Sequence, residues 1–144
     1  MTITEFMSKD HDRLDALFAS FAKTKDAGEA KSLFARFAAG LKTHIVWEED
    51  LLFPPFEEKT GMRAMGPTEV MRAEHREIKE ILSRIDENLQ RSRDTAELHA
   101  ALLDVLGGHN DKEEGILYPA LDRLLSRAEA EKVLAEIERT PALA

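Results

Sequence analysis

Apolar residues recur at intervals of three and four along most of the chain, and the strict alternation that is typical of strands is absent. A capping residue followed three positions later by glutamate occurs at Thr2, Asp26, Asp94 and Ser126, and proline follows Gly66. The pattern predicts an all-α protein with helices over residues 4–24, 27–52, 67–91, 95–117 and 127–139. The double proline at 54–55 is expected to end the second helix, and residues 119–125 to form a short helical turn.

The two halves of this pattern repeat each other. A shift of 64 residues aligns the first predicted helix with the third, and a shift of 65 aligns the second with the fourth. Two copies of a helical hairpin, packed back to back, form an antiparallel up-down four-helix bundle, because each copy covers the apolar face of the other. We expect this bundle over about residues 3–120, followed by a short C-terminal helix over about 126–139 on its outside.

Composition narrows the class of protein. A chain of 144 residues with 43% hydrophobic residues is expected to form one domain, residues 1–144. The net charge of −8 argues against a nucleic-acid partner and against an anionic membrane surface. Because cysteine is absent, disulfides, thiolate zinc sites and iron–sulfur clusters are not expected. No secretory signal and no membrane-spanning run is visible, so the expected location is the cytoplasm.

A motif written H-x-x-x-E-E-x-x-L-[FY]-P occurs twice, over residues 44–54 and 109–119. Positions four apart lie on one face of a helix, so each copy aims an imidazole and a carboxylate in the same direction. These two groups belong to a set of six polar residues on the apolar stripes of four helices: His11, His44, Glu48, His75, His109 and Glu113. A buried glutamate is costly unless it is paired or bound to a cation, and no Arg or Lys lies on the stripes.

The set of six therefore predicts a metal site. Six ligands with two carboxylates fit a pair of ions that both carboxylates bridge, with two histidines on each ion. Imidazole and carboxylate without thiolate favour iron or manganese, and the donor set also admits zinc.

Other polar and aromatic residues near the motif have alternative interpretations. Glu49 and Glu114 are expected to face solvent; the alternative is that they bind metal or orient a histidine. His99 aligns with no ligand in the repeat and is predicted to be a non-ligand. Tyr118 is predicted to pack on the face opposite His109, because it lies nine residues further along the helix.

The spacing of the six residues resembles that of the hemerythrin family, in particular its bacterial HHE cation-binding type. The resemblance covers about residues 3–120 and implies a non-haem centre of two iron ions. It implies that His11 and His44 bind one iron, that His75 and His109 bind the other, and that both glutamates bridge.

The sequence departs from the oxygen-carrying hemerythrins in two ways. Met71 stands one turn before His75, where those proteins have a further histidine, and its repeat mate is Met7. Both methionines are expected to be core residues, the alternative being that they line a pocket beside the metals. The second carboxylate, Glu113, lies four residues after the last histidine, whereas the carriers have an aspartate at the fifth position; Glu114 is the rival at that position.

The four-histidine, two-glutamate set looks more like bacterial proteins proposed to repair iron–sulfur centres. Those usually have an additional cysteine-containing domain that is not found in these 144 residues. We therefore expect a di-iron protein that binds or reacts with O2 or NO in sensing or redox chemistry. The alternative is an iron-handling or stress protein with ferroxidase, peroxide or repair activity and a redox or iron-receiving protein partner. Whether it is an enzyme and whether it oligomerises stay open.

Overall fold

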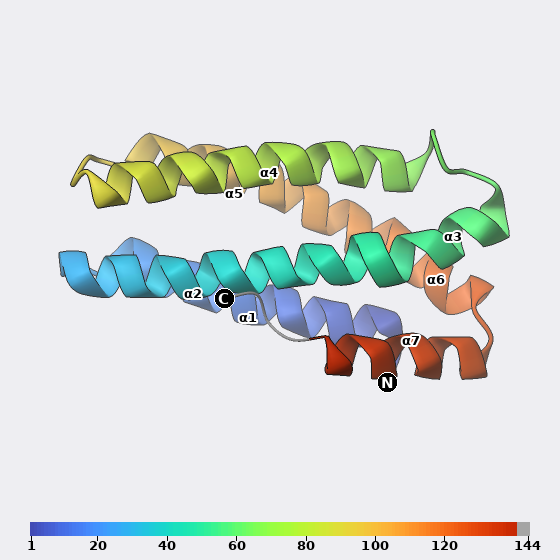
Figure 1. Ribbon diagram of the computed structural model, residues 1–144. Coiled ribbons are helices and arrows are strands. Elements are labelled where there is room, and N and C mark those ends of the chain that lie inside the picture. Colours follow the sequence, from blue (N-terminus) through green and yellow to red (C-terminus); the bar gives the residue numbers. More distant parts are fainter. Residues whose placement is uncertain (141–144) are drawn as a thin grey trace.

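The computed structural model describes residues 1–140, and within that range it consists of helices and turns without any strand (Figure 1). Its α-helices are α1 (Ile3–Lys23), α2 (Ala27–Val46), α3 (Phe53–Thr60), α4 (Pro67–Gln90), α5 (Ala96–Lys112), α6 (Tyr118–Leu124) and α7 (Arg127–Arg139). Two π-helical turns, η1 (Trp47–Leu52) and η2 (Glu113–Leu117), join α2 to α3 and α5 to α6. The predicted all-α class is confirmed. Among the described helices, none is long and apolar enough to cross a bilayer.

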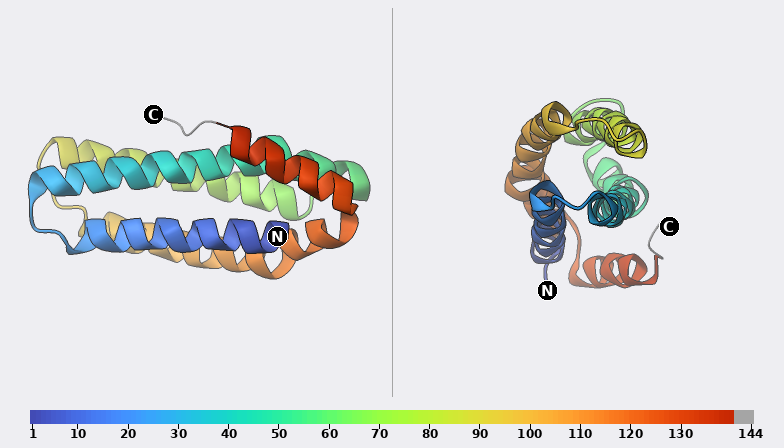
Figure 2. Two further views of the ribbon diagram at one scale, coloured as in Figure 1. Left: turned by 90° about the horizontal axis from the view of Figure 1, so that it is seen from below. Right: turned by 90° about the vertical axis from the view of Figure 1, so that its left-hand side faces the viewer.

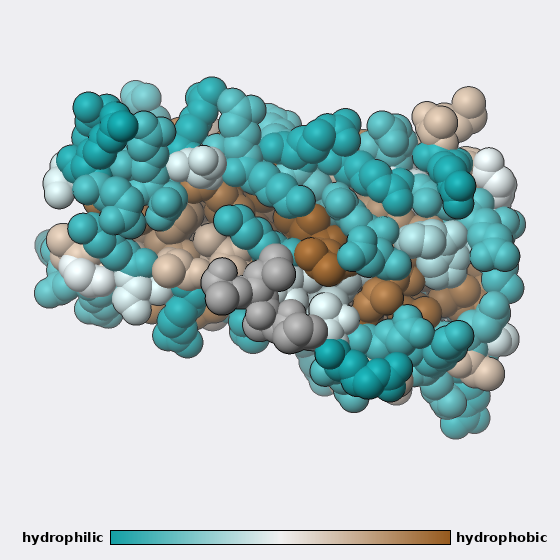
Figure 3. All heavy atoms as spheres, in the orientation of Figure 1, coloured by the Kyte–Doolittle hydropathy of each residue, from teal (hydrophilic) through white to brown (hydrophobic). Residues whose placement is uncertain are grey.

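Four long rods form the bundle: α1, α2 with its continuation α3, α4, and α5 with its continuation α6 (Figures 1 and 2). α1 packs on α2 and α4 packs on α5, which makes the two hairpins predicted from the repeat. The hairpins meet where α2 contacts α4 and where α1 contacts α6. On the face shown in Figure 3 the surface is largely hydrophilic, and apolar side chains show mainly in the seam between rods.

Two apolar clusters fill the interior. The first lies toward the α1–α2 and α4–α5 turns and includes Phe18, Phe37, Leu82 and Leu102. The second lies toward the other end, and its members include Ile3, Met7, Phe53, Met71, Tyr118 and Ile137. Along every rod the histidine of the predicted site falls between the residues of these two clusters. The polar site is therefore sealed on both sides by apolar side chains.

Both prolines at 54–55 lie inside a continuous rod, so the prediction that they end the second helix is wrong. The π-helical turn η1 precedes them, and the Phe53 N–H donates to the carbonyl of Glu48, five residues back. This bond interrupts the usual four-residue register. The prolines therefore begin a new α-helical segment, where an N–H has no helical partner to lose. The rod ends only at Gly61, whose φ of 73° is readily adopted by glycine.

The capping predictions hold at two helices in full. Thr2 and Ser126 both form complete capping boxes with the glutamate three positions later. Asp26 accepts from the Glu29 N–H without the reciprocal bond. The box expected at Asp94 does not form, because α5 begins one residue later and its N-cap residue is Thr95.

The C-terminal helix α7 covers the outside of the bundle, as predicted. It packs against η1 and buries Val133 and Ile137 in the second cluster (Figure 2). Lys59 of α3 forms an ion pair with Glu129 of α7 at 3.1 Å. This helix therefore lies along the side of the bundle, over the half that holds the two π-helical turns (Figures 1 and 2).

Candidate metal centre

All six residues predicted from the sequence converge between the two apolar clusters. The histidines come from α1, α2, α4 and α5, and the two glutamates come from η1 and η2. Each residue is at most 3% exposed: His11, His44, Glu48, His75, His109 and Glu113. Their helical spacing explains the convergence within a hairpin, because residues four apart share a face. The pseudo-symmetric packing of two hairpins brings the halves together.

The donor atoms fall into two overlapping groups. One group holds His11, His44 and Glu113, and the other holds Glu48, His75, His109 and Glu113; within each group the ligand atoms lie within 4.8 Å of one another. Glu113 belongs to both, with Oε1 at 3.2 Å from His11 Nε2 and Oε2 at 3.1 Å from His109 Nε2.

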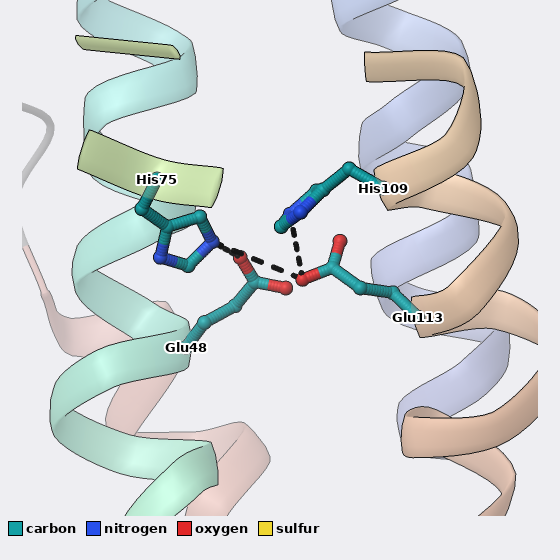
Figure 4. Close-up of side chains that lie close together, drawn as sticks. All are labelled: Glu48, His75, His109 and Glu113. Carbon is teal, nitrogen blue, oxygen red and sulfur yellow. Dashed lines mark ion pairs between the residues drawn. The ribbon is translucent and has the colours of Figure 1, made fainter. Parts of the chain in front are cut away.

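Glu48 also reaches both halves of the centre. Its Oε1 lies 3.1 Å from His75 Nε2, and its Oε2 lies 3.7 Å from His44 Nε2. Figure 4 shows the two carboxylates facing each other between His75 and His109. The arrangement fits two ions, each held by a histidine pair and bridged by two carboxylates.

Three buried polar atoms at the centre support this fit. Glu48 Oε1, Glu113 Oε2 and His75 Nε2 are inaccessible to solvent and have no hydrogen-bond partner among the described residues. The nearest polar neighbours of the two oxygens are histidine Nε2 atoms at 3.1 Å, and these contacts are ion pairs only when the histidine is protonated. Without that proton each buried group costs about 1–3 kcal/mol, and more when it is charged. A metal cation would satisfy all three atoms at once, so the residues present fit a bound metal pair.

The surroundings of His44 and His75 favour the charged imidazole in the metal-free protein. Burial disfavours charge on the His44 imidazole, but Glu48 and Asp10 outweigh burial and raise the pKa of His44 to about 10. Burial also lowers the pKa of His75, but hydrogen bonds to Glu48 and Glu49 outweigh burial and raise that pKa to about 9. The pKa of Glu48 is held well below its usual value, although burial opposes this, by His44 and by hydrogen bonds. Protons thus balance the carboxylates, and metal binding must displace them.

A second layer of four carboxylates holds the outer nitrogen of each histidine. The Nδ1 groups pair with carboxylate oxygens as follows: His44 with Asp10 at 2.8 Å, His109 with Glu74 at 2.9 Å, His75 with Glu49 at 2.7 Å and His11 with Glu114 at 3.1 Å. A carboxylate on Nδ1–H fixes the ring orientation and directs the Nε2 lone pair inward, which is the usual support of a metal-binding histidine.

The expectation that Glu49 and Glu114 simply face solvent is wrong. Their side chains are 30% and 39% exposed, yet each bonds a histidine of the opposite hairpin. The alternative reading, that they orient histidines, describes them correctly. The π-helical turns make this possible, since both members of each Glu-Glu pair turn toward the interior.

Asp10 and Glu74 belong to the site although the sequence motif did not predict them. Each precedes a histidine of its own helix but bonds the histidine of the neighbouring helix in the same hairpin. The signal was available in the repeat, because the same shift of 64 that aligns the histidines also aligns Asp10 with Glu74. An acidic residue at both matched positions of a duplicated site is the pattern to look for.

Tyr118 also contradicts its prediction. Its hydroxyl lies inside the centre, donating to Glu48 Oε2 at 2.6 Å and lying 3.0 Å from Glu113 Oε1. The Tyr118 N–H bonds the carbonyl of Glu113, five residues back. This extra residue in the turn changes the projected angle from His109 from about 180° to about 80°. Burial, together with both glutamates, raises the pKa of Tyr118 well above its usual value.

The remaining predictions near the motif agree with the structure. His99 lies away from the centre, with its Nε2 at 2.8 Å from the Thr95 hydroxyl and its ring against Phe18 and Phe21. Met7 and Met71 are buried in the second cluster, as expected of core residues. Their role as a lining beside metals stays a prediction.

The chain is similar in sequence to several known proteins. A hemerythrin-like protein of Schizosaccharomyces pombe is 28% identical over 138 residues, which cover 96% of this chain and 68% of that protein. The iron-sulfur cluster repair protein YtfE of Escherichia coli O157:H7 is 33% identical over 89 residues, which cover 55% of this chain and 40% of that protein. A DNA nickase of a Nostoc species is 24% identical over 96% of this chain, but only 38% of its own length is covered. No solved structure matches.

The family model described as the hemerythrin HHE cation-binding domain matches residues 2–121. That range contains all six central donors and the four outer carboxylates, so the match and the geometry concern the same part of the molecule. Family membership and the buried His/Glu cluster together support iron binding. The chain belongs to the hemerythrin HHE cation-binding family.

Proposed function

We propose that the protein holds two iron ions and that this centre binds or reacts with a small diatomic ligand, O2 or NO, in a sensing or redox role. One observation carries the proposal: six buried donors from both hairpins converge, and three of their inward atoms have no hydrogen-bond partner in the described chain. Bound iron supplies redox chemistry and affinity for diatomic ligands.

The protein residues have separate tasks in this proposal. His11 and His44 bind one iron, His75 and His109 bind the other, and Glu48 and Glu113 bridge them. The outer carboxylates keep the Nε2 lone pairs of the histidines directed inward. The apolar clusters on both sides keep bulk water away from the bound ions. Manganese or zinc would fit the same donors, and family membership favours iron.

The second candidate is an iron-handling or nitrosative-stress role, including repair of iron centres. It is favoured by the similarity to the iron-sulfur cluster repair protein YtfE, which covers 55% of this chain. In that role the protein would release iron to a partner protein, whereas a ligand sensor or redox protein would keep both ions through repeated cycles. Retention of iron therefore separates the two roles.

Anaerobic loading with ferrous iron tests the proposal directly. We expect two irons per chain, with optical changes on adding O2 or NO; one zinc per chain, or no iron, would contradict it. His44→Ala and Glu113→Ala should each lose metal, and His99→Ala is the matched control because its ring lies outside the centre. The second candidate would be favoured if the protein transfers iron to an apo iron–sulfur protein but does not lose iron to a chelator when that acceptor is absent.

We also propose that the chain is one cytoplasmic domain that binds no nucleic acid. The net charge of −8 opposes contact with phosphate backbones. We expect the protein to unfold in a single cooperative transition and to be recovered in the cytoplasmic fraction. We also expect it to cause no gel shift of DNA or RNA at low salt.

A further inference from the structure

The hydroxyl oxygen of Tyr118 lies among the donors of one half of the centre. It is 3.2 Å from His44 Nε2 and 3.4 Å from His11 Nε2. It is also 2.6 Å from Glu48 Oε2 and 3.0 Å from Glu113 Oε1. Neighbouring ligands on one ion with bonds of about 2.1 Å are separated by roughly 3.0–3.4 Å. Three of the four separations lie in or near this range, so the phenol oxygen stands where a further donor to that ion would stand.

The matched position in the other half has no such donor. A shift of 65 places Phe53 on Tyr118, and Phe53 carries no polar atom. Its ring stacks on the His75 ring, with centroids 5.8 Å apart and an interplanar angle of 8°. The Arg72 guanidinium carbon lies 5.2 Å from the Phe53 centroid. The otherwise duplicated centre therefore differs between its halves by one oxygen atom.

We propose that Tyr118 is a seventh protein ligand, a phenolate bound to the metal held by His11 and His44. The metal held by His75 and His109 then has one more open position than its partner, and we expect an external ligand to bind there first. This inference rests on the proposed di-iron centre. In the metal-free protein the phenol O–H donates to Glu48. On metal binding that O–H bond breaks, a lone pair of the oxygen forms the bond to the ion, and the proton passes to solvent.

The grouping of the donors is consistent with such a ligand. Among the described residues the His11–His44 group holds three donors, whereas the His75–His109 group holds four, because Glu48 falls within the second group. A phenolate would give the first group its fourth donor. Tyr118 is itself fully buried, so no rearrangement from the surface is needed to bring it to the ion.

The composition of the chain makes the test unambiguous. Tyr118 is the only tyrosine in the sequence, so any tyrosinate signal from the metal-loaded protein must arise from it. We expect diferric wild-type protein to show a visible phenolate-to-iron charge-transfer band with resonance-enhanced phenolate ring vibrations. Tyr118→Phe should keep two irons and lose both signals. The reciprocal Phe53→Tyr is the matched variant, since it adds a phenol to the other half.

Nitric oxide gives an independent comparison of the two irons. We expect the diferrous wild type to bind nitric oxide in two separate steps of a spectroscopic titration, with the His75–His109 iron first, and the two steps to move together in Tyr118→Phe. Wild-type protein with two irons but no phenolate vibrations overturns the assignment of Tyr118 and leaves the di-iron proposal standing. Wild-type protein that holds no iron overturns both. The wild-type spectrum alone decides the assignment if Tyr118→Phe does not fold.

Discussion

Asp10→Asn tests whether the outer carboxylates support the metal centre. The Asp10 carboxylate accepts from His44 Nδ1 at 2.8 Å and also from Arg13 Nε at 2.9 Å. Asparagine keeps the shape and can still accept a hydrogen bond, but it removes the negative charge that makes the imidazole a stronger donor to metal. The change therefore isolates charge from packing.

The size of the effect follows from burial. Replacing such a partner typically lowers metal affinity 10–100-fold, or about 1.4–2.7 kcal/mol. Solvent screens an exposed charge more than a buried one. The four side chains are increasingly exposed, at 11%, 21%, 30% and 39% for Asp10, Glu74, Glu49 and Glu114. We expect losses of affinity in that order, with Asp10→Asn near 100-fold and Glu114→Gln near 10-fold.

Competition with a chelator of known affinity measures these losses, with bound metal counted by mass spectrometry and helix content checked by circular dichroism. Glu80→Gln is the control, because Glu80 pairs with Arg84 on the surface and is 64% exposed. Its affinity should match the wild type. An Asp10→Asn protein that binds metal as tightly as Glu80→Gln, or a larger loss from Glu114→Gln than from Asp10→Asn, would refute the reasoning.

Three further predictions concern stability. Leu82→Ala should lower the free energy of unfolding by about 2–5 kcal/mol, because Leu82 is 1% exposed in the first cluster; a urea titration checks this, and a loss below about 1 kcal/mol would contradict it. Glu57→Gln should cost about 1.5–3 kcal/mol by the same assay, since it removes the negative charge that accepts a hydrogen bond from Arg72 and so ties α3 to α4. In the metal-free protein the pKa values of His44 and His75 are raised to about 10 and 9. The ion pairs of these histidines therefore stabilise the folded state fully below about pH 6.5, and this stabilisation is lost as the pH rises through the two raised pKa values. The Tm of that form should fall between pH 7 and 10; a constant Tm would count against the paired histidines.

The pattern of residues along the chain was sufficient for the order of the long helices and for the convergence of the inner donors, but not for the end of the second rod. A 3.6-residue period places His44 above Glu48 and His109 above Glu113 whatever the rest of the chain does. The duplication adds His11 and His75 on the partner helices, since a repeated hairpin must bury its repeated stripe. Both inferences need only local geometry and one packing rule, and both agree with the structure.

Only the tertiary structure decided what surrounds those donors. The π-helical turns rotate everything downstream of Glu48 and Glu113, and a prediction from the 3.6-residue period does not reveal them because it assumes an α-helical register throughout. That rotation brings Tyr118 to the centre and Glu49 and Glu114 to histidines of the opposite hairpin. Asp10 and Glu74 likewise act across helices, which depends on how two rods are rotated against each other. Sequence periodicity specifies a face of one helix, whereas contacts between helices require the packed bundle.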